Sequence, residues 1–379
     1  MRSVLSAVGV FLLVGLLFST CGAANVIVIG VNAELTGSIP VVGQSCKNAA
    51  EMAADEVNKA GGLEVAGVKY QIRLIVEDNE DKPESAAAVA QKLISQNQVL
   101  ALIGANASRN AIPAAQIAES AKVPMVSPWS TNVKTTQGKR YVFRACFIDD
   151  FQGVVCAKFA RENLKATKAA VLYDIASEYN KGIAEVFKRS FEKYGGKITA
   201  FETYTTGDQD FSSQLTRIRQ TDPEVLFLPN YYSEVPLQIQ QARRLGYTRK
   251  VLGSDSWGFP DIIKLGGADI EGHFFSTHYA PDIATPVAQR FIKAYEERFK
   301  EKPDDVAALT YDSFGMLFQA IKAAGKLDRE AVCDALSKIT LYEGVTGNMK
   351  FEGTGDPVKS AVFIQIKGGK FTYYDSVAP

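Results

Sequence analysis

This 379-residue sequence has few of the side chains on which metal sites and most catalytic sites depend. It contains only two histidines, His273 and His278, which flank one short apolar stretch. Their spacing fits neither a zinc site nor the histidine of a Ser-His-Asp triad. The glycine motifs that bind phosphates or dinucleotides after a strand are also missing. We therefore expect no enzyme activity, no metal ion and no cofactor.

The sequence has few cysteines and no net charge. Five cysteines in a chain of this length do not make a disulfide framework, although Cys146 and Cys156 could pair in an oxidising compartment. One is expected in a strand and the other in a helix, which argues against this bridge but leaves it open. Lysine plus arginine and aspartate plus glutamate number 42 each. Without a basic excess, we expect no nucleic-acid partner.

The one long apolar run lies at the N-terminus. Arg2 precedes an apolar stretch over residues 4–18, and small residues then lead to Ala24. A basic start, a stretch of this length and a small-residue exit predict a secretory signal peptide over residues 1–24. Cys21 permits a second interpretation, in which its lipidated thiol tethers the chain to a membrane. Both interpretations predict a periplasmic location.

Short β-branched strands then alternate with longer helices in two successive series. Repeated units of this kind imply parallel sheets with helices on both faces. The predicted fold is therefore α/β, with two doubly wound parallel-sheet lobes. The expected strands are 26–31, 70–76, 99–103, 123–126, 169–174, 199–204, 225–228 and 250–253, and the expected helices are 44–59, 83–96, 112–121, 179–194, 211–220 and 234–245.

The pattern changes after residue 278. Three helices follow closely, and the chain ends in antiparallel strands around a Gly368-Gly369 turn. No proline-rich or serine-rich linker separates the halves, so we expect the chain to cross between the lobes more than once, at short crossings that act as a hinge. The helices are expected over 286–299, 305–324 and 329–339, and the strands over 349–352, 361–366 and 371–374. The predicted division assigns residues 25–145 and 279–356 to lobe 1, and residues 146–278 and 357–379 to lobe 2.

Polar side chains that follow the strands are the candidate ligand-binding residues, because open parallel sheets bind ligands outside the carboxyl ends of their strands. Lobe 1 offers Ser108 and the run Trp129, Ser130 and Thr131. Hydroxyls and backbone donors at helix N-termini suit a carboxylate. Ser108 and Ser130 could instead be plain helix caps. Arg109 is expected on a solvated face.

Lobe 2 offers a different chemistry at the corresponding edge. Asp255 supplies one carboxylate, and Tyr179 and Tyr231 supply aromatic walls. A carboxylate suits an ammonium group, and aromatic rings cover apolar substituents. The two edges together would complement an amino acid zwitterion, with its carboxylate on lobe 1 and its ammonium shared with lobe 2.

Taken together, these residues match a known family. The chain resembles the periplasmic binding proteins of branched-chain amino acid ABC transporters, which have the type I periplasmic-binding fold. The resemblance covers essentially the whole chain after the leader. It implies two lobes, joined by a three-strand hinge, that close on an amino acid and deliver it to a membrane permease. Its markers are residues 33–37, 53–58 with Gly61-Gly62, 103–104 leading to Ser108, Ser127-Pro128 with Thr131-Asn132, 311–313, and 344–347 with Phe351.

The resemblance also implies roles for individual residues. Ser108 and Thr131 correspond to the hydroxyls that hold the ligand carboxylate and assist with the ammonium. Tyr231 and Tyr179 correspond to aromatic walls from the opposite lobe. Asp255 stands where the family usually has a carboxylate for the ammonium, often glutamate.

Two positions depart from the family pattern. Val42 stands where a bulkier aromatic side chain lines the pocket, and Trp129 replaces a small residue whose main chain meets the ligand. Leucine-like specificity is therefore less firmly implied than amino acid binding. The same fold could also bind an aromatic acid, an amide or a urea, or act as a ligand-sensing subunit. We expect a monomer.

Overall fold

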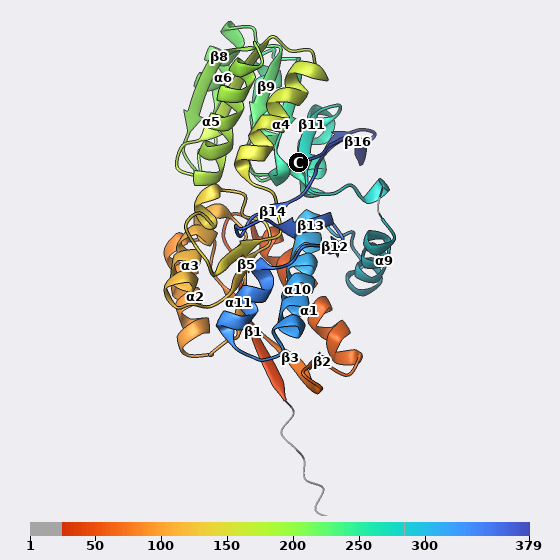
Figure 1. The fold of residues 1–379 in the computed structure, drawn as a ribbon. Helices are drawn as coiled ribbons and strands as arrows, with labels where there is room; N and C mark the ends of the chain where they lie inside the picture. The colour runs from red at the N-terminus through yellow and green to blue at the C-terminus, as the bar shows by residue number, and fades with distance from the viewer. Residues whose placement is uncertain (1–24, 284) are drawn as a thin grey trace, which may run out of the picture.

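The fold is that of a computed structural model that describes residues 25–283 and 285–379. The predicted signal peptide, with Cys21, lies outside these residues. Figure 1 shows two lobes, one above the other, with β1, β3 and α1–α3 in the lower lobe and β8, β9 and α4–α6 in the upper lobe. No helix in the described ranges is both long and apolar enough to cross a membrane.

The lower lobe, lobe 1, is built on a six-stranded sheet with the order β2-β3-β1-β4-β5-β6. All neighbours are parallel except the β2–β3 hairpin. The central strand β1 is rich in β-branched residues and almost wholly buried, as is typical of a strand with both faces covered. The strands are β1 (Val26–Ala33), β2 (Leu63–Val65), β3 (Val68–Asp78), β4 (Ala101–Ile103), β5 (Met125–Ser127) and β6 (Val142–Arg144).

Two pairs of helices contribute to the cover of this sheet. Helices α1 and α10 pack together, and α2 and α3 pack together. Apolar side chains such as Leu93, Ala111 and Ala115 join α2 and α3 to β4 and β5 in one buried cluster. The helices of this lobe are α1 (Pro40–Lys59), α2 (Pro83–Ser95), α3 (Ser108–Ser120), α9 (Pro286–Phe299), α10 (Asp305–Ala324) and α11 (Arg329–Ser337).

The upper lobe, lobe 2, is built on a seven-stranded sheet with the order β16-β15-β11-β10-β9-β7-β8. Its last two strands in the chain, β15 and β16, add antiparallel at one edge. The strands are β7 (Lys168–Asp174), β8 (Lys197–Tyr204), β9 (Val225–Leu228), β10 (Lys250–Gly253), β11 (Phe274–Thr277), β15 (Ala361–Ile366) and β16 (Phe371–Val377). The helices are α4 (Asp149–Glu162), α5 (Glu178–Lys193), α6 (Ser212–Gln220), α7 (Val235–Arg244) and α8 (Asp261–Gly266).

The chain passes between the two sheets three times, at residues 145–148, between β11 and α9, and at residues 359–360. The first and third crossings touch, because Lys359 Nζ donates to the carbonyl of Ala145 at 3.1 Å. A small third sheet, β12 (Tyr342–Gly344), β13 (Gly347–Phe351) and β14 (Pro357–Val358), precedes the last crossing. β14 pairs with β13, in the part of the chain predicted as lobe 1. The residue-level lobe boundaries stay a prediction.

Helix α3 differs from the sequence prediction in a way that affects the site. The predicted start was residue 112, with Pro113 in the first turn, but α3 begins at Ser108 and holds Pro113 in its interior. The Ala107 carbonyl accepts from the amides of Asn110 and Ala111 at 2.9 and 2.8 Å, which closes the first turn well before the proline. Ser108 therefore lies at the helix N-terminus.

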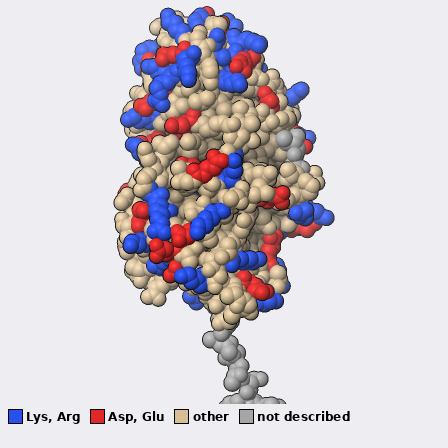
Figure 2. All heavy atoms as spheres, viewed as in Figure 1, with Lys and Arg blue, Asp and Glu red and all other residues tan. Residues whose placement is uncertain are grey.

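The four described cysteines are buried and unpaired. Cys146 Sγ donates to the Ser130 carbonyl at 3.2 Å, and Cys156 Sγ donates to Ser276 Oγ at 3.3 Å. Each thiol thus has its own acceptor, and the bridge left open by the sequence does not form. On the face shown in Figure 2, both lobes carry Lys and Arg interspersed with Asp and Glu.

Candidate functional site

A small cavity lies between the two lobes, at the carboxyl ends of both sheets. In this closed arrangement its walls nearly touch and leave no room for a water molecule. Its walls combine side chains from loops after the strands of both lobes. They are Asn106, Ala107, Ser108 and Trp129 from lobe 1, and Tyr179, Tyr231 and Asp255 from lobe 2.

The lobe 1 wall is formed by the N-terminus of α3. Ser108 is the first residue of this helix and is almost fully buried. Its Oγ accepts from Ser130 Oγ at 2.9 Å and from the Asn132 amide at 3.4 Å. Unpaired amides and the helix dipole favour negative charge at such an end. This wall is therefore suited to a carboxylate.

Glu34 holds the loop that leads into α3. Its buried carboxylate accepts from the amides of Asn106 and Ala107 at 3.1 Å each and from Asn110 Nδ2 at 3.0 Å. Burial is the largest influence on the pKa of Glu34 and raises it, while the bonds from the two asparagines act in the opposite direction. Sequence reasoning noted Glu34 only as a family marker, although it directly follows β1.

The prediction that Arg109 lies on a solvated face is wrong. Only 15% of its side chain is exposed, so it does not lie on a solvated face. Asp81 accepts from Arg109 Nε at 2.9 Å and from Nη2 at 2.7 Å. The guanidinium carbon lies 4.7 Å from the centre of the Tyr231 ring, which belongs to the other lobe. An ion pair within lobe 1 and a cation–π contact across the cleft thus keep this arginine out of water.

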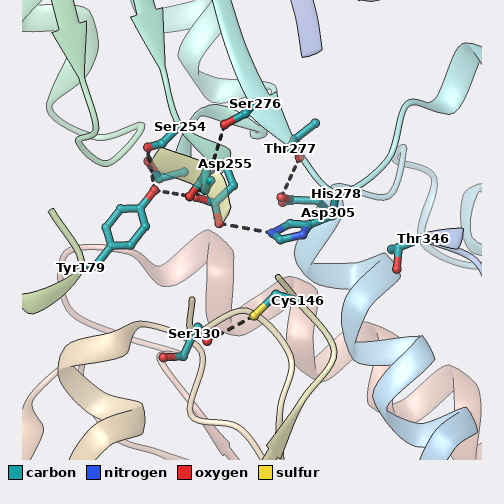
Figure 3. A network of polar contacts seen from close by, with 12 residues as sticks. Ser130, Cys146, Tyr179, Ser254, Asp255, Ser276, Thr277, His278, Asp305 and Thr346 are labelled. Carbon is teal, nitrogen blue, oxygen red and sulfur yellow. Dashed lines mark hydrogen bonds and ion pairs between the residues drawn. The ribbon is translucent and has the colours of Figure 1, made fainter. Parts of the chain in front are cut away.

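Asp255 dominates the lobe 2 wall and is 1% exposed. Its Oδ1 accepts from Tyr179 Oη at 2.6 Å and from Gln152 Nε2 at 2.9 Å. Its Oδ2 lies 3.3 Å from His278 Nε2. Figure 3 shows Asp255 between Tyr179 and His278, with Ser130 on the opposite side of the cleft. Three groups of the chain therefore surround one buried carboxylate.

The charge of Asp255 has no cationic partner. Among the described residues, His278 is the only basic side chain with a nitrogen within 4.0 Å of this carboxylate. Burial lowers the pKa of His278 to about 4, against the opposing effect of Asp255 itself, so the imidazole is neutral at pH 7. His278 directly follows β11. The sequence criterion used for the other candidates, a polar side chain directly after a strand, would also have selected it.

Of the remaining predicted residues, Trp129 lines the cavity, whereas Val42, Ser130 and Thr131 lie around it. Ser130 supports Ser108, as above, and Val42 is fully buried in the core of α1. Thr131 is buried beside Asp149, although neither side chain has a hydrogen bond of ordinary geometry within the described ranges. The indole of Trp129 packs against Tyr231, with ring centres 6.1 Å apart.

Nothing in the described part of the chain resembles a metal site. No cluster of three or more His, Cys, Asp or Glu residues is placed to hold a metal ion there. The site instead brings a helix N-terminus, a carboxylate and aromatic rings together around one small gap. This combination can bind a small dipolar molecule.

The chain is similar to known solute-binding proteins over nearly its whole length. The family described as "Periplasmic binding protein" matches residues 26–370. The leucine-, isoleucine-, valine-, threonine- and alanine-binding protein of Pseudomonas aeruginosa is 29% identical over 354 residues, which cover 93% of this chain and 90% of that protein.

Two solved structures share the fold. A leucine-binding protein of Thermotoga maritima is 35% identical, with a TM-score of 0.88, and the match covers 93% of this chain and 99% of that chain. The branched-chain amino acid transporter substrate-binding protein of Streptococcus pneumoniae, solved in complex with isoleucine, is 32% identical, with a TM-score of 0.87. That match covers 94% of this chain and 100% of the other.

Proposed function

Because this chain belongs to the periplasmic binding protein family, whose members are solute receptors and not enzymes, we propose that it is the amino acid receptor of an ABC importer. The relatives described above are named for branched-chain and other small amino acids. We therefore propose a branched-chain or other small apolar amino acid as the ligand. The receptor would deliver it to a membrane permease.

One observation carries this proposal: the unneutralised Asp255 faces the same cavity as the N-terminus of α3. A carboxylate group fits beside Ser108, because that end of the helix favours negative charge. An ammonium group fits beside Asp255, because a buried carboxylate without a cation is costly. An α-amino acid carries both groups on one carbon atom, so a single ligand could contact both walls at once.

The aromatic rings account for the rest of the ligand. Tyr231 lies between Tyr179 and Trp129, at ring-centre distances of 5.5 and 6.1 Å. Such rings cover an apolar side chain without demanding a polar group from it. The three rings would thus enclose the aliphatic part of the ligand.

We also propose a periplasmic location and a monomeric state for the receptor. Its family serves ABC importers from the periplasmic side, so a cleaved or lipidated leader is consistent with this role. We propose that the chain acts as a monomer. The partner is the membrane permease, which receives the ligand when the two lobes separate.

Calorimetry with the processed chain tests the proposed ligand class. The panel would comprise the twenty amino acids, benzoate, an aliphatic amide and urea. We expect heat of binding with one or more apolar amino acids, and a loss of about 100-fold or more in affinity for Asp255→Asn. Tight binding of benzoate or an amide, without binding of any amino acid, would overturn the proposal.

A further inference from the structure

The second histidine of this chain has no role in the family pattern or in the ligand contacts described so far. It is fully buried at the start of the second crossing between the lobes, and its ring lies on Phe147, with ring centres 3.9 Å apart. Phe147 belongs to the first crossing. The His278 imidazole thus joins two of the three crossings to the carboxylate that faces the cavity.

The protonation state of His278 decides whether Asp255 has a positive charge beside it. An ionised carboxylate only accepts hydrogen bonds, so the imidazole nitrogen that faces it carries the proton. The other ring nitrogen, Nδ1, has no hydrogen-bond partner among the described residues, as expected for an unprotonated nitrogen in an apolar place. His278 then orients Asp255 as a neutral donor. It adds no positive charge.

The other neighbours of Asp255 behave in the same way. Tyr179 and Gln152 are neutral donors, and Gln152 also donates to Ser276 Oγ at 2.9 Å. Lys359, on the third crossing, is buried, and its positive charge opposes protonation of the His278 ring. Tyr179 and Gln152 thus hold the Asp255 carboxylate by hydrogen bonds, and none of these groups neutralises its charge.

We propose that His278 is a positioning residue that makes this receptor require an ammonium group on its ligand, because it holds Asp255 in place without neutralising it. The inference rests on the proposed amino acid receptor function. A lysine or arginine at position 278 would complete the ion pair internally. The receptor would then accept carboxylic acids that have no amino group.

Ligand discrimination tests this inference. The probes are L-leucine and 4-methylpentanoate, which is leucine with hydrogen in place of the ammonium. We expect the unmodified protein to prefer leucine by roughly 100-fold or more, because 4-methylpentanoate leaves Asp255 buried and unpaired. His278→Lys should reduce this ratio by about tenfold or more. His278→Gln, which keeps a neutral donor, should restore most of it.

The other histidine provides the matched control. His273 lies at the opposite end of β11, where its Nδ1 accepts from the Val251 amide at 3.3 Å, remote from the cleft. His273→Gln should leave the preference for leucine unchanged. If His278→Lys binds leucine with the unmodified preference, the inference is wrong although the receptor function stands. If the unmodified protein itself fails to prefer leucine, the proposed function is wrong.

A measurement on the unmodified chain keeps the test valid if His278→Lys does not fold. Nitrogen-15 spectra of a chain with two histidines are assigned directly by comparison with His273→Gln. We expect the ligand-free protein at pH 7 to show His278 as a neutral ring protonated at Nε2. A doubly protonated His278 would already neutralise Asp255 and would overturn the inference.

Discussion

At the scale of single residues, the most unusual group is Asp149, the first residue of α4. Its carboxyl group is 2% exposed, faces Thr131 and has no hydrogen bond of ordinary geometry within the described ranges. Burial raises the pKa of Asp149 from 3.8 to about 8, with a smaller contribution from the negative charge of Asp255. Asp149 is thus largely protonated at neutral pH in the folded protein.

This raised pKa makes stability depend on pH. Between about pH 4 and pH 8 the folded state binds a proton that the unfolded state releases, so the free energy of unfolding falls as pH rises. Asp149→Asn should remove this contribution and stabilise the protein at pH 8 by at most about 4 kcal/mol relative to pH 5. Urea unfolding at both values measures the difference. Asp150→Asn, which changes an exposed neighbour on the same helix, is the control. The prediction is contradicted if the free energy of unfolding changes equally between the two pH values in Asp149→Asn and in the unmodified protein.

Sequence reasoning placed two residues correctly from topology alone, and their contact with a ligand stays a prediction. Ser108 and Asp255 both follow parallel strands, and both reach the same cavity. It was wrong for Arg109, whose burial depends on Asp81 and on a ring from the other lobe. It also gave no role to His278, since the chain does not reveal which acid a histidine will face until the crossings are folded.

At the scale of elements, the short helix η2 (Asp255–Trp257) sets the direction of the key carboxylate. Gly253 ends β10 immediately before this turn, and a Cβ at that position would overlap the indole ring of Trp257. Trp257 is fully buried, and its Nε1 donates to the Leu228 carbonyl at 3.1 Å. Neither the ring nor the strand has room to move aside.

Gly253→Ala should therefore damage both stability and binding. We expect a loss of about 1–3 kcal/mol in the free energy of unfolding, as for other overpacked cores, together with weaker ligand binding. Chemical denaturation and calorimetry measure the two effects. Lys250→Ala, at the exposed start of the same strand, should change both only slightly, and a Gly253→Ala protein with unaltered binding would contradict this role of the turn.

Elements with strong local signals could be predicted well. Helices α9 and α10 have the predicted bounds, because Pro286 sets the start of one and a left-handed Gly325 ends the other. Strand β6 and the short helices near the cleft were not predicted as separate elements. Strands of three residues, such as β6, carry too little periodicity to be recognised, and they depend on neighbours distant in the sequence.

At the scale of the whole molecule, the walls that the two lobes contribute to the site leave no room for a ligand between them. A ligand can enter only when the lobes separate, and its contacts with both lobes then favour closure. We expect the radius of gyration measured by X-ray scattering to decrease when a saturating amino acid is added. A radius unchanged under saturation would contradict hinge closure.

An exposed ion pair spans the two lobes at the edge of the cleft. Lys134 Nζ lies 2.6 Å from Glu178 Oε2, with about half of each side chain exposed. Reversing the charge at this position in Lys134→Glu should speed ligand release by a factor of about 5 at low ionic strength, and by less at high salt. Stopped-flow fluorescence measures the rates. The double exchange Lys134→Glu with Glu178→Lys should restore them, and an effect that does not depend on salt would argue against a contact formed on closure.

The central claim is that Asp255 and the N-terminus of α3 bind the two charged ends of one amino acid. A crystal structure of the chain with its amino acid tests this most directly. We expect the ligand nitrogen within about 3.2 Å of an Asp255 carboxylate oxygen and the ligand carboxylate within the same distance of Ser108 Oγ. A ligand bound in the reverse orientation, or outside this cavity, would contradict the claim.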